Sequence, residues 1–315
     1  MKRMLLSAGI LLAAAAGTGV ISRKYYLQFV KRPSHHILDP DPERHGVLPV
    51  EYIEQAKQAK DALAGREEIM HVIAEDGAVM EGLLYRTAEN NKKVVIAFHG
   101  YQGGCYWDMA RFAPMYEKLN CDYLLIQERA HENSEGPRVT FGVKEKRDGI
   151  VWCREIIRRY GEDVQILMHG VSMGAATILC MSGEADLPVQ VKGIAADCGY
   201  CNMYEETDNV LKKIPELPRK IMLELISMWS VVYTGSSLEA LSPENAVKHA
   251  RIPALLIHGE KDALVPHYMQ ARIANAYAGE KTVMSVPGAA HVMSWLKDPV
   301  QYEQKFTELA EKCFD

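Results

Sequence analysis

The stretch that decides the fold is VQILMHGVSMGAA, residues 164–176. It begins with an apolar run that has the length and β-branched content of a buried strand, and small residues typical of a helix begin at Ala175. Between them lies the pattern Gly-x-Ser-x-Gly, centred on Ser172. On a sharp turn from strand to helix, the flanking glycines allow a tight backbone and the serine hydroxyl projects above the sheet. The sequence therefore predicts that Ser172 is a nucleophile at a helix N-terminus.

A neutral serine is a weak nucleophile and needs a base within hydrogen-bond reach. We predict that His291 is this base, because it lies in the segment PGAAH, residues 287–291, just past the last predicted strand. A loop in that position can overhang the edge of the sheet. Without such a partner, the Gly-x-Ser-x-Gly pattern would equally describe an ordinary glycine-rich turn.

The base in turn needs a carboxylate that holds one imidazole tautomer and stabilises the imidazolium. We expect this residue to be Asp262, because it follows a predicted strand in the segment HGEKDALVP, residues 258–266. Glu260, two residues earlier, is the alternative. The chain order serine, aspartate, histidine differs from the orders found in the chymotrypsin and subtilisin types.

Acyl transfer also needs two amide donors for the oxyanion that develops on the substrate. We expect one to be the backbone N–H of Met173, directly after the nucleophile. The other is expected from Tyr101, in the loop HGYQGG that follows a predicted strand at residues 93–98. This chemistry requires neither a cofactor nor a metal ion, and we expect none.

Composition limits the classes of protein to consider. The chain has 315 residues, 48% of them hydrophobic, which suits one large α/β domain. Its net charge of −5 gives no indication of a nucleic-acid partner. Seven cysteines, an odd number without regular spacing, argue against a disulfide framework. Cys198 and Cys201 have redox spacing, but there is no thioredoxin-like pattern around them and no second pair for a zinc site.

The N-terminus has a pattern of its own. After a basic start, residues 4–22 contain no charge, and that length is close to the ~20 residues that cross a bilayer as a helix. We predict an uncleaved membrane anchor over residues 1–22, with a cleaved signal peptide as the alternative. The side of the membrane stays open, because the Lys and Arg count and the signal-like character point in opposite directions. Residues 23–64 are expected to form a linker and a short helix.

From residue 65 to residue 315 the pattern alternates between strands and helices. Such alternation predicts a mostly parallel sheet that is covered by helices on both faces. Residues 198–250 show no strand and carry many apolar, methionine and aromatic side chains, so we expect a helical cap inserted over the strand ends. These side chains could line an apolar acyl site, or they could only attach the cap to the body.

Taken together, these motifs resemble the α/β-hydrolase superfamily, and more narrowly its bacterial membrane-anchored, serine aminopeptidase-like serine hydrolases. The segments that carry the resemblance are HGY at 99–101, GVSMG at 170–174, DCGY at 197–200, HGEKD at 258–262 and GAAH at 288–291. One segment departs from the family. Relatives commonly have Asp-x-Arg-Gly-His-Gly-x-Ser-x-Gly, whereas residues 127–136 here are QERAHENSEG, which places the geometry of that loop in doubt.

The resemblance implies an α/β-hydrolase fold and a serine hydrolase that cleaves a carboxylic ester, or an amide, of a small molecule or short peptide through an acyl-enzyme. A serine peptidase or an acyltransferase could use the same triad. A hydrolase fold that only binds partners at the membrane is the alternative from another class.

Overall fold

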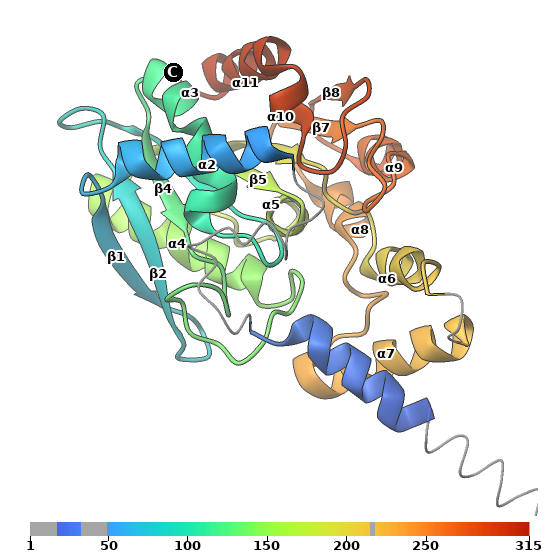
Figure 1. Ribbon diagram of the computed structural model, residues 1–315. Coiled ribbons are helices and arrows are strands. Elements are labelled where there is room, and N and C mark those ends of the chain that lie inside the picture. The colour runs from blue at the N-terminus through green and yellow to red at the C-terminus, as the bar shows by residue number, and fades with distance from the viewer. Residues whose placement is uncertain (1–17, 33–48, 215–217, 315) are drawn as a thin grey trace, which may run out of the picture.

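The computed structural model describes residues 18–32, 49–214 and 218–314. Its centre is an eight-stranded sheet with the strand order β1-β2-β4-β3-β5-β6-β7-β8 (Figure 1). The strands are β1 (Glu68–Ile73), β2 (Val79–Tyr85), β3 (Lys93–Phe98), β4 (Asp122–Ile126), β5 (Gln165–Val171), β6 (Val191–Asp197), β7 (Ala254–Gly259) and β8 (Lys281–Val286). Only β2 runs against its neighbours, pairing antiparallel with β1 and β4, and the other pairs are parallel. The predicted, mostly parallel sheet is confirmed.

Helices cover both faces of this sheet. One face packs against α4 (Glu145–Tyr160), α5 (Met173–Ser182) and α9 (Tyr268–Ala276), and the other against α2 (Val50–Leu63), α3 (Ala113–Lys118) and α11 (Pro299–Cys313). The period of two along a strand decides which side chain enters which core. In β3, Val94, Ile96 and Phe98 join the first core, and Val95 and Ala97 the second.

The helical segment between β3 and β4 is irregular. It starts as a π-turn, η1 (Cys105–Met109), tightens into a 3₁₀ turn, η2 (Ala110–Phe112), and becomes α-helical only in α3. A proline lies in the first turn of α3. Since proline lacks an N–H and clashes with a preceding helical turn, a regular α-helix is favoured only from that point onward.

We refer to the helical segment between β6 and β7, the region of the expected insertion, as the cap. It consists of α6 (Met203–Leu211) and α7 (Arg219–Thr234), and the chain returns to the sheet through α8 (Pro243–Ala246), η3 (Val247–His249) and β7. On α7, Met222, Leu223 and Ile226 point into a small apolar core of their own.

A helix over residues 18–30 completes that core. It lies alongside α7 (Figure 1), and its Tyr26 and Val30 are buried in the same apolar cluster. The sequence pattern predicted a linker from residue 23, so this packed helix is a difference from expectation. Ser22, Tyr26 and Val30 are buried at a spacing of four, which is one face of a helix, but exposed charged residues between them hide the pattern.

Most of the expected membrane anchor, residues 1–17, lies outside the described residues. Among the residues that the structure does describe, no helix has both the length and the apolar character that crossing a membrane requires.

The loop after β4, which departs from the family pattern, keeps a compact shape. Ala130 and Glu132 have φ angles of 61° and 44°, the left-handed region that glycine enters most easily. The buried Arg129 guanidinium holds the base of this loop, with Nε 2.8 Å and Nη2 2.7 Å from the two carboxylate oxygens of Asp148. It also bonds Asp76 at 2.9 Å. The loop therefore tolerates the missing glycines because an ion-pair network fixes its start.

This network gives a stability prediction with a pH signature. In the Arg129→Ala variant, Asp148 is a buried carboxylate without its partner, which should lower the free energy of unfolding by about 3–5 kcal/mol at pH 8. In the wild-type protein, burial raises the pKa of Asp148 to about 6 even though Arg129 lies beside it. Without the arginine the pKa rises further, so at pH 5 the carboxyl is protonated in the folded state and the loss should shrink.

Urea unfolding at pH 8 and pH 5 measures the difference. The surface Arg158–Glu155 pair is the matched control, and Arg158→Ala should leave the unfolding free energy almost unchanged at both pH values. An equal loss at both pH values in Arg129→Ala would show that lost packing, not the stranded carboxylate, is the cause.

Candidate active site

Ser172 occupies the turn between β5 and α5 in a strained backbone conformation. Its φ and ψ are 53° and −115°, a combination that residues other than glycine rarely adopt. The Ser172 N–H donates to the backbone oxygen of Asp197, at the end of β6, over 2.8 Å. Close contact between β5, α5 and β3 is possible because Gly170 and Gly174 have no side chain. A Cβ on Gly174 would lie 2.3 Å from the Phe98 carbonyl oxygen.

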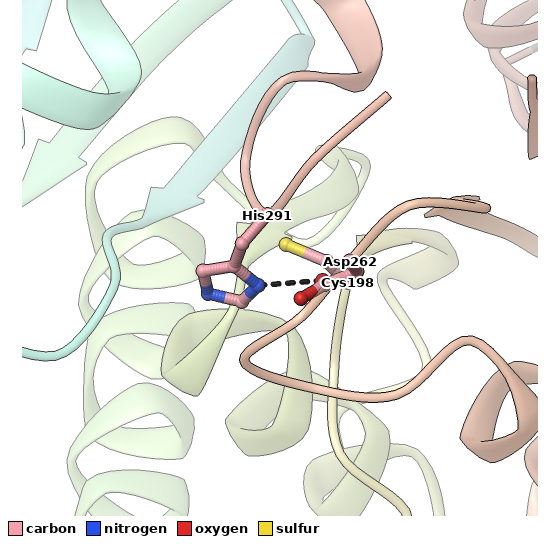
Figure 2. A group of neighbouring side chains, drawn as sticks. All are labelled: Cys198, Asp262 and His291. Carbon is pink, nitrogen blue, oxygen red and sulfur yellow. Dashed lines mark hydrogen bonds and ion pairs between the residues drawn. The ribbon is translucent and has the colours of Figure 1, made fainter. Parts of the chain in front are cut away.

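The structure brings Ser172, His291 and Asp262 together. His291 comes from the loop after β8, and its Nε2 lies 2.8 Å from the Ser172 hydroxyl oxygen. Its Nδ1 lies 2.7 Å from Oδ2 of Asp262, in the loop after β7 (Figure 2). The His291 side chain is 17% exposed and that of Asp262 is fully buried. An approaching molecule can therefore reach the imidazole, whereas the carboxylate is shielded.

Its own loop holds the Asp262 carboxylate in place. Oδ1 accepts the backbone N–H groups of Leu264 and Val265 at 2.9 and 2.8 Å. Burial alone would raise the pKa of Asp262, but hydrogen bonds from His258 and His291 outweigh it and hold the pKa well below its usual range. The group is thus ionised at neutral pH, as the partner of an imidazolium must be. Glu260, the alternative residue, is exposed to solvent.

The two expected oxyanion donors come from turns close to Ser172, since a Cβ on Gly100, next to Tyr101, would lie 3.4 Å from the Ser172 Cβ. Met173 is the first residue of α5, and a helix leaves its first amides without an intrahelical partner. Tyr101 follows β3, and its side chain packs in the same small apolar cluster as that of Met173. The amides that flank Tyr101 are both bonded: the Gly100 N–H to Asp108 Oδ2 at 2.8 Å, and the Gln102 N–H to His131 Nε2 at 3.1 Å.

Two buried histidines join the Tyr101 loop to the loop after β4, a role that the sequence did not reveal. His99 Nδ1 donates to the Gly100 carbonyl, and its Nε2 accepts the Glu128 N–H at 2.9 Å. His131 Nδ1 donates to the Arg129 carbonyl. Burial lowers the pKa of His99 to about 4 and that of His131 to about 3, so both are neutral and can accept these amides. The histidine in the segment RAH, residues 129–131, was the available signal.

Cys198 is a further neighbour of the three residues. Its Sγ lies within 4.8 Å of ligand atoms of Asp262 and His291, an arrangement drawn in Figure 2. Burial raises the pKa of this thiol well above its usual value, so the sulfur is protonated. Structural zinc sites use four ligands with deprotonated thiols, and here the carboxylate and the imidazole are bonded to each other. Cys198 and Cys201 are both buried, whereas reactive cysteines are partly exposed.

Solved structures of other proteins share this arrangement of strands and helices. No family model matches the chain. The uncharacterized protein YqkD of Bacillus subtilis (strain 168) is 22% identical over 317 residues, covering 100% of this chain and 99% of that protein. Among solved structures, the Pyrococcus furiosus esterase Pf2001 is 20% identical, with a TM-score of 0.65 over 81% of this chain and 94% of its own. Acetyl xylan esterase 1 from Thermoanaerobacterium sp. is 14% identical, with a TM-score of 0.59 over 85% and 95%.

The chain has the α/β-hydrolase fold. A solved structure described as an alpha/beta hydrolase, GrgF from Penicillium sp., aligns with a TM-score of 0.58 at 15% identity over 78% of this chain and 98% of its own. At such identities the likeness establishes the arrangement of the chain, and the chemistry has to be argued from the site.

The turn at Ser172 gives a second stability prediction. In Gly174→Ala the new Cβ meets backbone atoms of β3 that cannot move aside, so the turn must shift, at a cost of about 1–3 kcal/mol or more. Gly235 is the matched control, because it has a positive φ of 80° but open space around its Cβ. Gly235→Ala should cost only the backbone strain, about 1–2 kcal/mol.

Urea unfolding compares the two variants, and near-ultraviolet circular dichroism reports whether the packing around the turn has changed. If Gly174→Ala is no less stable than Gly235→Ala, the close approach of α5 to β3 does not constrain the turn.

Proposed function

We propose that the protein is a serine hydrolase that cleaves a carboxylic ester, or an amide, of a small molecule through an acyl-enzyme. The observation that carries this proposal is the unbroken line of hydrogen bonds from Ser172 through His291 to Asp262. The hydrolase fold and its esterase neighbours support the same reaction class. In this assignment Ser172 is the nucleophile, His291 the general base and Asp262 the residue that orients it.

In the first half-reaction, the Ser172 oxygen attacks the substrate carbonyl carbon while His291 Nε2 takes the hydroxyl proton. The carbonyl double bond becomes a C–O⁻ single bond, and the N–H groups of Met173 and Tyr101 stabilise this oxyanion. Asp262 stabilises the imidazolium without taking its proton. The tetrahedral intermediate collapses, the bond to the leaving alcohol breaks, and that alcohol receives the proton held by His291.

The second half-reaction repeats these steps with water. His291 removes a proton from the water, whose oxygen attacks the acyl carbon, and the proton then returns to the Ser172 oxygen as the acid leaves. If another alcohol or an amine replaced the water, the same residues would perform acyl transfer. A peptidase would use the same steps on an amide, so product analysis with an ester, an amide and an added acceptor alcohol distinguishes these readings.

The reactive serine is tested directly with a fluorophosphonate probe and short p-nitrophenyl esters. The wild-type protein should be labelled and should hydrolyse the esters, and Ser172→Ala should lose both activities. Asp262→Asn should keep the fold but lower kcat by about 10⁴-fold, because the asparagine favours the wrong imidazole tautomer. Glu260→Gln is the matched control and should behave as wild type, since Glu260 is exposed. A folded wild-type protein that reacts with neither probe would instead favour the binding-protein reading.

We also propose that the apolar residues 4–22 attach the protein to a membrane. The sequence of this stretch supports the proposal, as do exposed apolar side chains nearby: Val20 and Ile21 at the start of the described helix, and Ile221, Met228 and Val232 on α7. Exposed apolar side chains of this kind suit contact with the interface of a bilayer.

Attachment is tested by fractionating cells that produce the full chain. We expect the wild-type chain in the membrane fraction after carbonate extraction. Changing both Leu11 and Leu12 to arginine should release it, because each arginine at a helix centre costs about 3 kcal/mol on insertion. The control Gln28→Arg adds a charge outside the apolar stretch and should stay with the membrane. Wild-type protein in the soluble fraction would overturn the proposal.

A further inference from the structure

Residues 18–32 form a strap that runs between the cap and the body of the protein. On the cap side, the Arg23 Nε donates to the Tyr233 phenol at 2.8 Å, and the ring of Tyr26 stacks on that of Tyr233 with their centroids 5.6 Å apart. Tyr26 is 3% exposed and Val30 1% exposed. Apolar packing therefore fixes the strap to α7.

The end of the strap is bonded to the loop after β4. The two terminal nitrogens of Arg32 donate to the backbone oxygens of Ser134 and Glu132, each at 2.5 Å. The Val139 N–H donates to the Val30 carbonyl at 2.9 Å, and a β-bridge joins the next residues along. These bonds attach the strap to the same loop that His131 ties to the Tyr101 loop.

A third contact joins the strap directly to the candidate oxyanion residue. The Tyr101 phenol donates to the carbonyl oxygen of Phe29, which lies near the end of the strap helix. The Tyr101 ring packs against Phe141 at a centroid distance of 5.2 Å and lies in the same cluster as Met173. The residue that offers the oxyanion amide is thus held through its own side chain by a segment 72 residues away in sequence.

We propose that the strap is a working part of the active site, which positions Tyr101 and thereby aims its amide at the oxyanion. This inference rests on the proposed hydrolase function. The bonds of Gly100 and Gln102 fix the loop on both sides of Tyr101. The Gly100 carbonyl, which shares a peptide plane with the Tyr101 N–H, also accepts from His99 Nδ1 at 2.8 Å and from the Gly103 N–H at 3.1 Å. These bonds orient one end of that plane, and the phenol bond to Phe29 holds Tyr101 at the other end through its side chain.

The Tyr101→Phe variant tests this positioning role, because it keeps the amide and the ring and removes the bonds of the phenol to the Phe29 carbonyl and to the side-chain amide of Gln102. Complete loss of one oxyanion donor costs about 10²–10³-fold in kcat, so a misaimed donor should cost about tenfold, with KM changed less than twofold. Affinity for a trifluoromethyl ketone, which forms a tetrahedral adduct with the serine, should fall by the same factor as kcat/KM. Loss of stability alone would not change these two quantities together.

A double-mutant cycle tests whether the strap acts through Tyr101. Arg32→Ala frees the end of the strap and should lower kcat several-fold in the wild-type background. In the Tyr101→Phe background the same change should have almost no further effect, since the contact through which it acts is already absent. Tyr204→Phe, which removes an exposed phenol bond within the cap, is the matched control and should leave kcat unchanged.

The outcomes separate this inference from the proposed function. A wild-type protein that reacts with no ester and no fluorophosphonate contradicts the function itself. An active wild type with an equally active Tyr101→Phe variant overturns only the role of the strap. Additive losses in the double mutant would also overturn it, because the two residues would then act independently.

Discussion

The site depends on one strained turn. Ser172 can hold its unfavourable φ because β5, α5, β3 and β6 pack around the turn that carries it. Two glycines allow the backbones to approach, and the bond from the Ser172 N–H to the Asp197 carbonyl ties the turn to β6. Strain of this kind persists where the surrounding structure over-determines the conformation. The hydroxyl is therefore placed by the whole sheet, and His291 and Asp262 need only be brought to it by loops.

Charge is distributed around this turn in a way that favours one imidazolium. Asp262 stays ionised because two backbone amides and two histidines surround its oxygens. Asp197, the other buried carboxyl near His291, receives one hydrogen bond from Ser294, and burial raises its pKa. His99 and His131 stay neutral for the same reason. Asp262, whose pKa is lowered, is bonded to the imidazole, and the neutral histidines behind the oxyanion loop add no positive charge that would compete with it.

The sequence predicted the three central residues because their positions follow from local rules. Each comes directly after a strand with a clear apolar pattern, and the carboxyl ends of parallel strands meet at one edge of the sheet. Helix 18–30 and the histidine links were missed because they depend on contacts between distant segments. The loop after β4 was a different difficulty, since Ala130 and Glu132 occupy left-handed positions where the sequence offers no glycine. An ion-pair network outside the local pattern compensates for it.

The energies of these contacts indicate the direction in which the strap acts. Burying Val30 contributes about 1.5–3 kcal/mol, and the stacked Tyr26 ring adds apolar contact, whereas a hydrogen bond such as that between Tyr101 and Phe29 contributes about 1 kcal/mol net. Packing against α7 therefore decides where the strap lies, and the phenol bond only transmits that position. A shift of the cap would move the strap with it and would reach the oxyanion loop through Phe29. Because the phenol bond is the weakest of these contacts, a large shift would break it before the strap left the cap.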